Sequence, residues 1–390
     1  MALTYCHVIV VGAGIGGLTA ALSLQRNGFR VSVYEQASEL GEFGAGLLVT
    51  PNAMHALEFL GIGEAIVTTS NVSNELLIKH FRSGEVIHRR PAGGYYVSKY
   101  GAGHFQVHRA DLHRALSAAV LANDSGCVHL AHTFGSLVQD DSGVTAHFAN
   151  GIVADGDALI GCDGCRSAVR DMVYGTAPAS YSGQVAFRAL IPAENESEHL
   201  RTQGACMYIG PDRIFLHYPL RMGSLMNVVA ISRQPRWQQE GWTIPAKVSE
   251  LLELYQDSHP LVLGMIGAIQ PKALFKWGLR DRDPLQQWTL GRVSMLGDAA
   301  HPISSFFLGQ GAVVAIEDGM VLGRCFAKAL SPQEALRRYE EVRKQRANAV
   351  QIHSRERAKA LQNSNLEHLG PGQSADDLGL FGYDPTTVPV

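Results

Sequence analysis

The chain has 390 residues, of which 46% are hydrophobic and 18% charged, and its net charge is −3 at pH 7. This composition is typical of a globular protein with a sizeable core and argues against a disordered chain or a nucleic-acid-binding surface. Six scattered cysteines form no disulfide framework, which predicts a cytoplasmic protein. The apolar N-terminal run is too rich in glycine for a membrane span and lacks the features of a signal peptide.

Residues 6–35 predict a strand, a helix and a second strand in immediate succession. A β-branched run at 6–11 is followed by a glycine-rich turn, by a helical pattern at 18–28 and by a second strand at 29–35. A strand, glycine turn, helix and strand within about 30 residues form the βαβ unit of dinucleotide-binding folds.

The glycines of this turn suit the binding of a pyrophosphate. Gly12 permits the tight turn, Gly14 lets the phosphates approach the backbone, and Gly17 lets helix and strand pack closely. The helix start supplies free N–H groups and the positive end of the helix dipole. Glu35 ends the second strand, where a carboxylate binds ribose hydroxyl groups and disfavours a 2′-phosphate. The unit therefore predicts bound FAD or NAD rather than NADP.

The central part of the chain adds elements of the same kind and then changes character. A helix is expected at 108–122, and 143–164 is typical of a hairpin that turns at Asn150-Gly151 and leads into a buried strand. Residues 176–275 instead predict alternating strands with little βαβ character. A mostly β region is therefore inserted among the nucleotide-binding segments.

Residues 161–170, GCDGCRSAVR, contain a Cys-x-x-Cys pair. Cys162 and Cys165 have the spacing of a redox or metal pair, but no second such pair exists and an acid lies between them. We therefore expect no metal site. The residue of interest is instead Asp163, which ends a predicted strand and precedes a glycine.

Residues 296–319 combine an acid, a rigid turn and a glycine-rich helix start. Asp298 follows a predicted buried strand, and His301-Pro302 then turns the chain. Gly309-Gln310-Gly311 opens an apolar helix, and its glycines leave backbone N–H groups accessible. A helix start stabilises a nearby negative charge by about 0.3–1 kcal/mol. The segment is expected to lie against a ligand.

The last long element is a helix. Ser331-Pro332-Gln333-Glu334 is a capping box with proline at the first helical position, and it predicts a charged helix that runs to about residue 362. The tail beyond residue 370 is expected to be a loop.

Three motifs in order resemble one enzyme family. GAGIGG at 12–17 with Glu35, GCDGCRSAVR at 161–170, and LGDAAHP, GQG and AIEDG within 296–319 are similar to the motifs of the single-component FAD-dependent aromatic hydroxylases. The resemblance covers the chain from residue 7 to about 350. It implies an α/β fold with a Rossmann-type FAD-binding domain split in sequence, an inserted β-sheet substrate domain and a long C-terminal helix.

The implied division of the chain has four parts. They are an FAD-binding domain at 1–75, 103–175 and 276–330, a substrate domain at 76–102 and 176–275, a C-terminal helix at 331–370 and a tail at 371–390.

The resemblance also implies an activity. NADH or NADPH would reduce bound FAD, and a flavin hydroperoxide formed with dioxygen would hydroxylate an activated aromatic ring of the hydroxybenzoate or hydroxypyridine type, with or without loss of a carboxyl group. No second glycine fingerprint exists, so the nicotinamide cofactor is expected to dock transiently. An epoxidase or natural-product oxygenase, a non-oxygenase flavoprotein and an NAD-dependent dehydrogenase stay open as alternatives. A monomer or a homodimer is expected, with no nucleic-acid partner.

Residues that would contact the cofactor follow from the family motifs. Arg109 is expected against the flavin or its phosphates, with a solvated arginine at a helix start as the alternative. The full expected set is Gly12, Gly14, Ile15, Gly16, Gly17, Glu35, Gln36, Arg109, Asp163, Asp298, Gly309, Gln310 and Gly311.

A substrate pocket is expected along the strand RIFLHYPL at 213–220. Alternation places Ile214, Leu216 and Tyr218 on one side and His217 on the other. Tyr218 is expected to hydrogen-bond a phenol-like hydroxyl, with His217 in reserve or simply packed, and Pro302 is expected beside the flavin ring.

The resemblance also gives the pocket lining, as Leu48, Arg188, Cys206 and Ile214. Arg188 lies in an apolar strand and is expected to meet either a structural partner or the flavin or substrate. Leu48 and Ile214 stand where the hydroxynicotinate enzymes of the family have histidines, which favours a different substrate.

Overall fold

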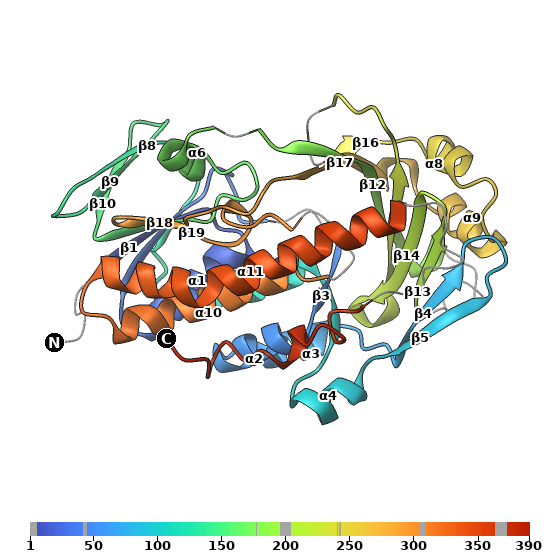
Figure 1. Cartoon of the computed structure of the whole chain (residues 1–390), viewed down its shortest axis with the longest axis horizontal. Coiled ribbons are helices and arrows are strands. Elements are labelled where there is room, and N and C mark those ends of the chain that lie inside the picture. The colour runs from blue at the N-terminus through green and yellow to red at the C-terminus, as the bar shows by residue number, and fades with distance from the viewer. Residues whose placement is uncertain are drawn as a thin grey trace.

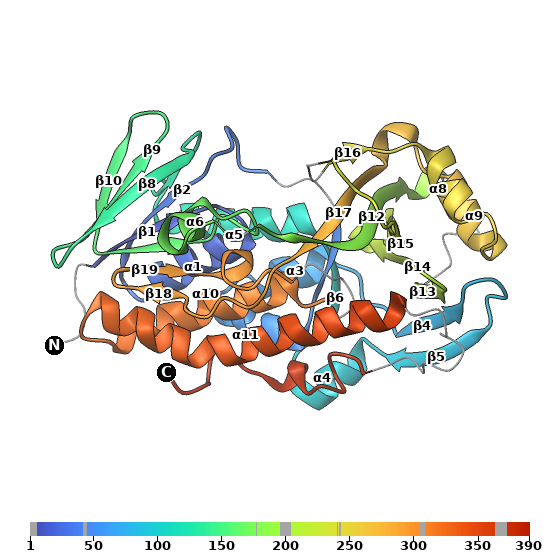
Figure 2. The same ribbon diagram turned by 45° about the horizontal axis from the view of Figure 1, so that its top comes forward.

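A computed structural model gives the fold of most of the chain (Figure 1). It describes residues 6–41, 45–176, 178–195, 204–239, 241, 243–303, 309–362 and 373–390, without the side chains of 360–362. Two sheets dominate, one toward each end of the molecule, and a long helix runs between them (Figure 2).

The first sheet has six strands in the order β18-β19-β11-β1-β2-β7 and is parallel except between β18 and β19. Most of its strands are short runs of apolar residues buried on both faces, as expected for a parallel sheet covered by helices. Their bounds are β1 His7–Val11, β2 Arg30–Tyr34, β7 Val128–His129, β11 Ala158–Gly161, β18 Thr289–Leu290 and β19 Val293–Met295. Val11 pairs with both Tyr34 and Gly161, so the carboxyl ends of β1, β2 and β11 meet at one edge.

Helices pack on this sheet and on one another. Glycines allow α1 and α10 to approach closely, because a Cβ at Gly319 would lie 2.7 Å from the Ala20 nitrogen and one at Gly323 would lie 2.2 Å from Ser23 Oγ. The helices of this half are α1 Ile15–Arg26, α2 Pro51–Phe59, α3 Gly63–Thr69, α5 Arg109–Asn123, α6 Ala168–Tyr174, α10 Gly311–Lys328 and α11 Pro332–Gln362. No helix in the described part of the chain is both long and apolar enough to cross a membrane.

The predicted capping box at the start of α11 is confirmed. The Glu334 backbone N–H donates to Ser331 Oγ over 3.2 Å, and the Glu334 carboxylate accepts a hydrogen bond from the Leu330 N–H over 2.9 Å. These bonds satisfy backbone donors that a helix start leaves open. Figures 1 and 2 show α11 running along α10 and reaching toward the second sheet.

The second sheet has eight strands in the order β16-β17-β12-β15-β14-β13-β4-β5. It is antiparallel except between β13 and β4. The bounds are β4 Glu75–His80, β5 Val86–Pro91, β12 Ser180–Pro192, β13 Ala205–Gly210, β14 Arg213–Leu220, β15 Leu225–Arg233, β16 Ile244–Pro245 and β17 Phe275–Asp281. Helices α8 Val248–Leu254 and α9 Pro260–Gly267 cover one face, where they share a hydrophobic core with β12–β15.

Two smaller sheets complete the fold. β3 Gly46–Val49 pairs with β6 Phe105–His108. β8 Phe134–Gln139, β9 Val144–Phe148 and β10 Val153–Gly156 form a three-stranded antiparallel sheet. The predicted hairpin turn between β9 and β10 is confirmed, since Gly151 has φ +84° and its N–H donates to the Phe148 carbonyl. The remaining helix, α4, spans Gly94–Tyr100.

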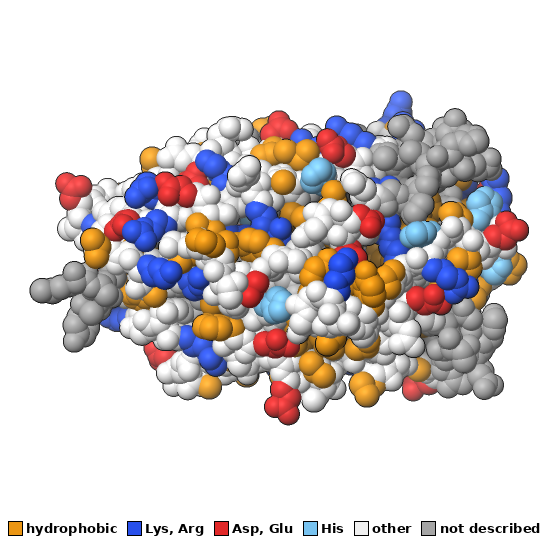
Figure 3. Space-filling view, turned by 60° about the horizontal axis from the view of Figure 1, so that its bottom comes forward, with side chains coloured by type: hydrophobic (Ala, Val, Ile, Leu, Met, Phe, Trp, Pro, Cys, Tyr) orange, Lys and Arg blue, Asp and Glu red, His pale blue; other side chains and the backbone are white. Residues whose placement is uncertain are grey.

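The topology differs from the expected division of the chain at two places. The boundary at 275/276 cuts β17, which belongs wholly to the eight-stranded sheet because it pairs with β12. Helix α4 lies within the segment assigned to the substrate domain, yet Tyr96 packs in the core of the six-stranded half, against Phe381 of the tail. On the face shown in Figure 3, acidic and basic side chains are interspersed, in keeping with the small net charge.

Candidate functional site

The three motif glycines of the first turn have different surroundings. Gly12 has φ +107°, and a Cβ on it would lie 2.4 Å from the Cys162 carbonyl oxygen. A Cβ on Gly17 would lie 2.0 Å from the Gly12 carbonyl oxygen, so β1 and α1 could not pack as they do. A Cβ on Gly14 would meet nothing within 4 Å. Packing within the protein therefore requires Gly12 and Gly17, whereas Gly14 faces open space.

The start of α1 has no side-chain cap. Gly14 is the N-cap, and the first turn contains no acidic residue. Ile15 is 3% exposed and points into the core, and a Cβ on Gly16 would lie 2.9 Å from Leu296. Ile15 and Gly16 can thus contribute to a ligand site only through their backbone N–H groups, at the positive end of the helix dipole.

Glu35 follows β2 beside this turn. Its two carboxylate oxygens accept hydrogen bonds from the backbone N–H groups of Ala13, over 2.8 Å, and Ala37, over 2.9 Å. Each oxygen retains further capacity to accept, so a ribose could still bind there. His113 of α5, which the sequence analysis missed, lies 2.8 Å from the Ala13 carbonyl oxygen through Nε2 and so ties the turn to α5. Gln36 is exposed.

Asp298 and Arg109 lie close enough for their charges to interact. Asp298 is in a 3₁₀ turn, Gly297–Ala299, and Arg109 begins α5. The Asp298 side chain is exposed to solvent, yet the protein around it raises the pKa of the carboxyl by desolvation, against the opposing charges of His301 and Arg109. Desolvation lowers the pKa of Arg109, and Asp298 opposes that shift. An exposed carboxylate under strong desolvation is typical of a recess.

The turn after Asp298 is held by a buried ion network that the sequence analysis did not predict. His301 Nε2 lies 2.6 Å from Asp318 Oδ2, and Asp318 Oδ1 accepts a hydrogen bond from Arg343 Nε over 2.7 Å. Burial raises the pKa of Asp318, but His301 and Arg343 outweigh it, so the pKa lies below its usual value. Pro302 is buried directly after His301. Arg343 of α11 thus fixes this turn through Asp318 of α10.

A second branch of the network reaches the start of α10. Glu317 binds Arg343 and Arg346, and its Oε1 accepts from Asn52 Nδ2 over 2.5 Å. Asn52 Nδ2 also donates to Gln310 Oε1 over 3.2 Å. The Gln310 side chain is therefore engaged inside the protein, and its contribution to a ligand site is through the backbone.

The glycines beside Gln310 are arranged as the motif predicts. Gly309 has φ +64°, and a Cβ on it would lie 2.9 Å from Leu48 Cδ1, so Leu48 packs against this helix start. Gly311 is the first residue of α10. Residues 304–308, between Pro302 and this helix start, lie outside the described residues.

The Asp163 side chain also holds its own loop. Its Oδ1 accepts from Ser167 Oγ over 2.5 Å, and its Oδ2 accepts from the Val169 N–H over 3.1 Å. The carboxylate therefore caps α6. As at Glu35, each oxygen retains capacity to accept, so the cofactor contact of Asp163 stays a prediction.

One face of the eight-stranded sheet carries the expected pocket residues. Ile214 and Leu216 share a hydrophobic cluster, and Leu216 also packs with Tyr218, as the predicted alternation requires. The register Arg188↔Val229↔Leu216 places Arg188 on this face two strands away. The face is directed toward β3, because a Cβ on Gly46 would lie 2.6 Å from the Tyr218 ring.

The assignment of Cys206 to the pocket is wrong, and His217 is packed, which was the alternative given for it. Cys206 and His217 are paired across β13 and β14, so they share the opposite face, where Cys206 packs in the core beneath α8 and α9. His217 is fully buried and stacks on Tyr208 with ring centroids 6.2 Å apart. Burial lowers the pKa of His217 to about 3, so the ring is neutral. Neither residue can line a cavity that contains Tyr218.

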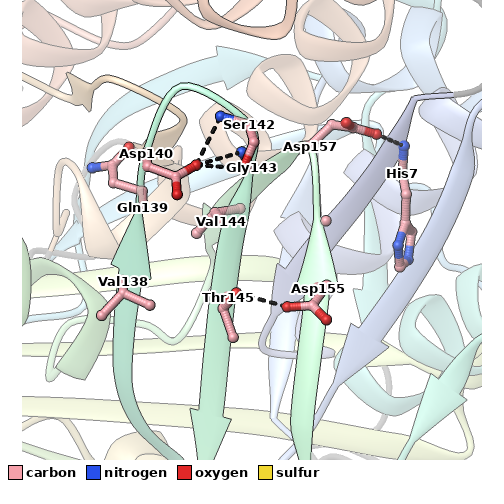
Figure 4. A pocket seen from close by; sticks show the side chains of 11 residues that line it. His7, Val138, Gln139, Asp140, Ser142, Gly143, Val144, Thr145, Asp155 and Asp157 are labelled. Carbon is pink, nitrogen blue, oxygen red and sulfur yellow. Dashed lines mark hydrogen bonds between the residues drawn. The ribbon is translucent and has the colours of Figure 1, made fainter.

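A groove of about 410 Å³ lies elsewhere, along β8–β10 (Figure 4). Its polar groups are used locally. Asp140 accepts from the backbone N–H groups of Ser142 and Gly143, Thr145 donates to Asp155, and the His7 N–H donates to Asp157. None of the expected site residues lines this groove.

Comparison with known proteins identifies the family. A family model described as an FAD binding domain matches residues 5–354. The chain is 37% identical to 3-hydroxybenzoate 6-hydroxylase of Polaromonas naphthalenivorans (strain CJ2) over 367 residues, which cover 93% of this chain and 90% of that enzyme. It is 34% identical to 6-hydroxynicotinate 3-monooxygenase of Pseudomonas fluorescens over 390 residues, covering 98% and 97% of the two chains. The chain belongs to the FAD-dependent aromatic hydroxylases. This family consists of monooxygenases, so the dehydrogenase and non-oxygenase alternatives are set aside.

Solved structures agree with the fold of this hydroxylase. HpxO of Klebsiella pneumoniae, complexed with FAD and uric acid, is 26% identical with a TM-score of 0.86 and covers 97% of this chain and 95% of its own. A salicylate hydroxylase substrate complex, 24% identical with a TM-score of 0.81 over 98% and 96% of the chains, shares the fold. The predicted Rossmann-type α/β fold is confirmed.

FAD is the cofactor of this hydroxylase, and the residues present fit it. The open space at Gly14 and the uncapped start of α1 suit a pyrophosphate, and Glu35 lies at the adjacent strand end, where a ribose would bind. The start of α10 adjoins Leu48 of β3, and Gly46 of the same strand contacts Tyr218, so a flavin ring held at this helix start would lie near Tyr218.

Proposed function

We propose that this hydroxylase adds a hydroxyl group to the ring of a hydroxybenzoate, using dioxygen and either NADH or NADPH. The observation that carries the proposal is the shared sheet face of Arg188 and Tyr218, directed toward β3. A hydroxybenzoate has two polar groups, a carboxylate and a phenol oxygen, and these two side chains suit them.

Arg188 supports the choice of an anionic substrate. Its guanidinium lies 5.4 Å from the centre of the Trp277 ring, which orients it along the sheet face. Burial lowers the pKa of Arg188 to about 10, with Arg109 adding to the shift and Tyr218 opposing it. The guanidinium remains charged at neutral pH, and a planar guanidinium binds a carboxylate in a bidentate manner.

Tyr218 supports a hydrogen bond to the phenol oxygen of the substrate. Burial raises the pKa of Tyr218 to about 12, against the charge of Arg188. The side chain is therefore a neutral donor at pH 7 rather than a base. A donor at the substrate oxygen stabilises negative charge there as the ring is attacked, which lowers the barrier to hydroxylation. Bound FAD, once reduced, supplies the activated oxygen.

The surrounding side chains support exclusion of water. Ile214 is 4% exposed, and Leu216 and Leu48 extend the apolar wall toward the start of α10. Water in such a site would divert reducing equivalents into hydrogen peroxide. Hydroxynicotinates also carry a carboxylate, but the apolar Leu48 and Ile214 favour a benzene ring over a pyridine ring.

The test is a substrate panel measured with the FAD-loaded enzyme. Oxidation of NADH and of NADPH would be followed with 3-hydroxybenzoate, 3-amino-4-hydroxybenzoate, 6-hydroxynicotinate and phenol, with isotopic dioxygen on any hit. We expect isotope incorporation with a hydroxybenzoate and little turnover of phenol. Arg188→Met should raise KM for the benzoate about tenfold to a hundredfold, while Arg233→Met, an exposed arginine of the same sheet, should not. Equal turnover of phenol and benzoate would contradict the proposal.

We also propose that the enzyme works in the cytoplasm as a monomer or homodimer. All six cysteines are free thiols, which supports a reducing compartment. Light scattering on the purified holoenzyme would distinguish the two oligomeric states.

A further inference from the structure

Strand β3 adjoins three separate parts of the candidate site. The Ala45 carbonyl oxygen accepts a hydrogen bond from the Arg109 N–H over 3.0 Å, at the start of α5. Leu48 packs on Gly309, at the start of α10. Gly46 contacts Tyr218 of the eight-stranded sheet. The position of β3 therefore sets the spacing between Tyr218 and the residues on the flavin side.

A single buried side chain, on the strand next to Tyr218, links β3 to the eight-stranded sheet. The Gly46 N–H donates to Asn227 Oδ1 over 2.8 Å, across 181 residues of sequence. Asn227 lies in β15 and is the register partner of Tyr218 in β14. The same side chain thus adjoins Tyr218 on one strand and fixes the backbone that the Tyr218 ring packs against.

Gly46 itself leaves no room for movement at this contact. A Cβ on it would lie 2.6 Å from both Tyr218 Cε2 and Tyr218 Oη. The Tyr218 ring therefore fills the space that a side chain at Gly46 would need. A small shift of β3 would displace the Tyr218 hydroxyl directly.

The Nδ2 group of Asn227 argues against a role in stability alone. Asn227 is fully buried, and its Nδ2 has no hydrogen-bond partner among the described residues. Leaving a buried donor unsatisfied costs as much as, or more than, one neutral hydrogen bond gains. Every other residue of β15 between Met226 and Ile231 is apolar and buried, so an apolar side chain would suit the strand. Full burial also means that Asn227 does not contact a ligand.

We propose that Asn227 is a positioning residue, which holds the Gly46 backbone of β3 in register with Tyr218 and so sets the distance between the Tyr218 hydroxyl and the flavin side of the site. The role in turnover rests on the proposed function, whereas the positioning of β3 can be measured without a substrate.

Hydrogen exchange of the FAD-loaded enzyme tests the positioning. Asn227→Leu should accelerate exchange in the peptide that contains Gly46 by about tenfold or more, with exchange elsewhere and FAD content unchanged. Gln351→Leu is the matched control, because Gln351 is likewise a buried amide with one hydrogen bond to the backbone, here donated to the Arg282 carbonyl, and one unsatisfied atom. Unchanged exchange at Gly46, or a general increase equal to that of the control, would overturn the proposal.

Two further variants keep the test informative if Asn227→Leu folds poorly. Asn227→Asp retains an acceptor for the Gly46 N–H and should restore slow exchange. Gly46→Ala leaves Asn227 intact but pushes Tyr218 aside.

The effect on turnover is measured with any substrate that the panel identifies. Asn227→Leu and Gly46→Ala should both lower kcat about tenfold and raise the fraction of NAD(P)H lost as hydrogen peroxide, with KM changed less than threefold. Native coupling in both variants would overturn the role in turnover. If no panel member is hydroxylated, the proposed function fails, while the exchange result still decides the positioning of β3.

Discussion

The two halves of this hydroxylase differ in the kind of polar group that they bury. Beside the six-stranded sheet, Asp318, Glu317 and Arg343 are fully buried and paired with one another. In the eight-stranded sheet, both ring nitrogens of His217 and the Nδ2 of Asn227 are buried without hydrogen-bond partners among the described residues. The first half thus buries paired charges, whereas the polar side chains buried in the second sheet are neutral. Unsatisfied buried atoms occur in both, among them His301 Nδ1 and Gln351 Oε1 of the first half.

This difference fits the proposal that the first half binds the cofactor and the second half the substrate. A cofactor has one fixed shape and charge, so its site can rest on a rigid network of ion pairs. A substrate sheet has to suit different rings in different relatives, and it is shaped by strand register and apolar side chains instead. Variants in the two halves can show whether a rigid ion network matters only in the cofactor half.

The largest effect is expected at Arg343. Arg343→Met leaves Glu317 and Asp318 without their shared cation in the core, and breaking a buried ion pair costs about 3–5 kcal/mol. The free energy of unfolding should fall by that amount in a urea titration. Arg337→Met is the control, since Arg337 pairs with Glu341 on the surface and should contribute about 0–1 kcal/mol. Similar losses of unfolding free energy in both variants would show that the buried network does not contribute specially to the stability of this half.

Gly14→Val should abolish FAD binding without unfolding the protein. The side chain enters space that is open in the protein, so only a ligand would meet it. We expect at least a hundredfold loss of affinity, about 3 kcal/mol, measured from flavin absorbance after dialysis. Gly17→Val should instead prevent folding, seen by circular dichroism, because its Cβ would clash with the Gly12 carbonyl. A yellow Gly14→Val protein would refute the pyrophosphate site.

Tyr218→Phe probes the substrate half. Loss of a hydrogen-bond donor used as the ring is attacked should lower kcat roughly ten- to a thousandfold, with FAD content and KM nearly unchanged. Product and consumed NAD(P)H would be measured together, and more hydrogen peroxide is expected. Tyr181→Phe, on a tyrosine that donates to the Gln234 carbonyl elsewhere in the sheet, serves as the control. Equal rates and coupling in Tyr218→Phe would exclude this hydroxyl from the reaction.

The smallest effect concerns His217 and pH. Its pKa in the folded protein, about 3, is below the ordinary value of 6.5. The stability contributed by the neutral ring is therefore complete above pH 6.5 and is lost as the pH falls toward 3. Between pH 6.5 and 5 the loss is about 2 kcal/mol. His217→Leu should remove this part of the acid dependence, whereas the exposed His353→Leu should leave it. Urea titrations at pH 6.5 and pH 5 would measure the loss of unfolding free energy in each protein.

The cofactor half could be predicted from sequence where its chemistry is local. Gly12, Gly14 and Gly17 lie within one turn, and Glu35 follows at the next strand end, so spacing alone places them together. His113 and Asn52 could not be predicted, because their partners Ala13 and Glu317 are 100 and 265 residues away. The capping of α6 by Asp163 could not be predicted, because a cap and a ligand contact use the same carboxylate at the same strand end.

The substrate half could be predicted within a strand but not between strands. Alternation in β14 correctly separated Tyr218 from His217. Cys206 was assigned to the wrong face because its facing depends on the β13–β14 register, which a single residue of shift would reverse. Asn227 belongs to no motif, and the only sign of its role in the sequence is that it is a polar residue in an otherwise apolar stretch.

Arg343 also bears on how the chain is made. Its carboxylate partners, Glu317 and Asp318, are synthesised first and lack their arginine partners until α11 has left the ribosome. The cofactor half therefore cannot complete its core until α11 has followed α10, even though β1, α1 and β2 are complete at the very start. Flavin capture is expected to follow translation, after the two ends of the sequence have met around α10.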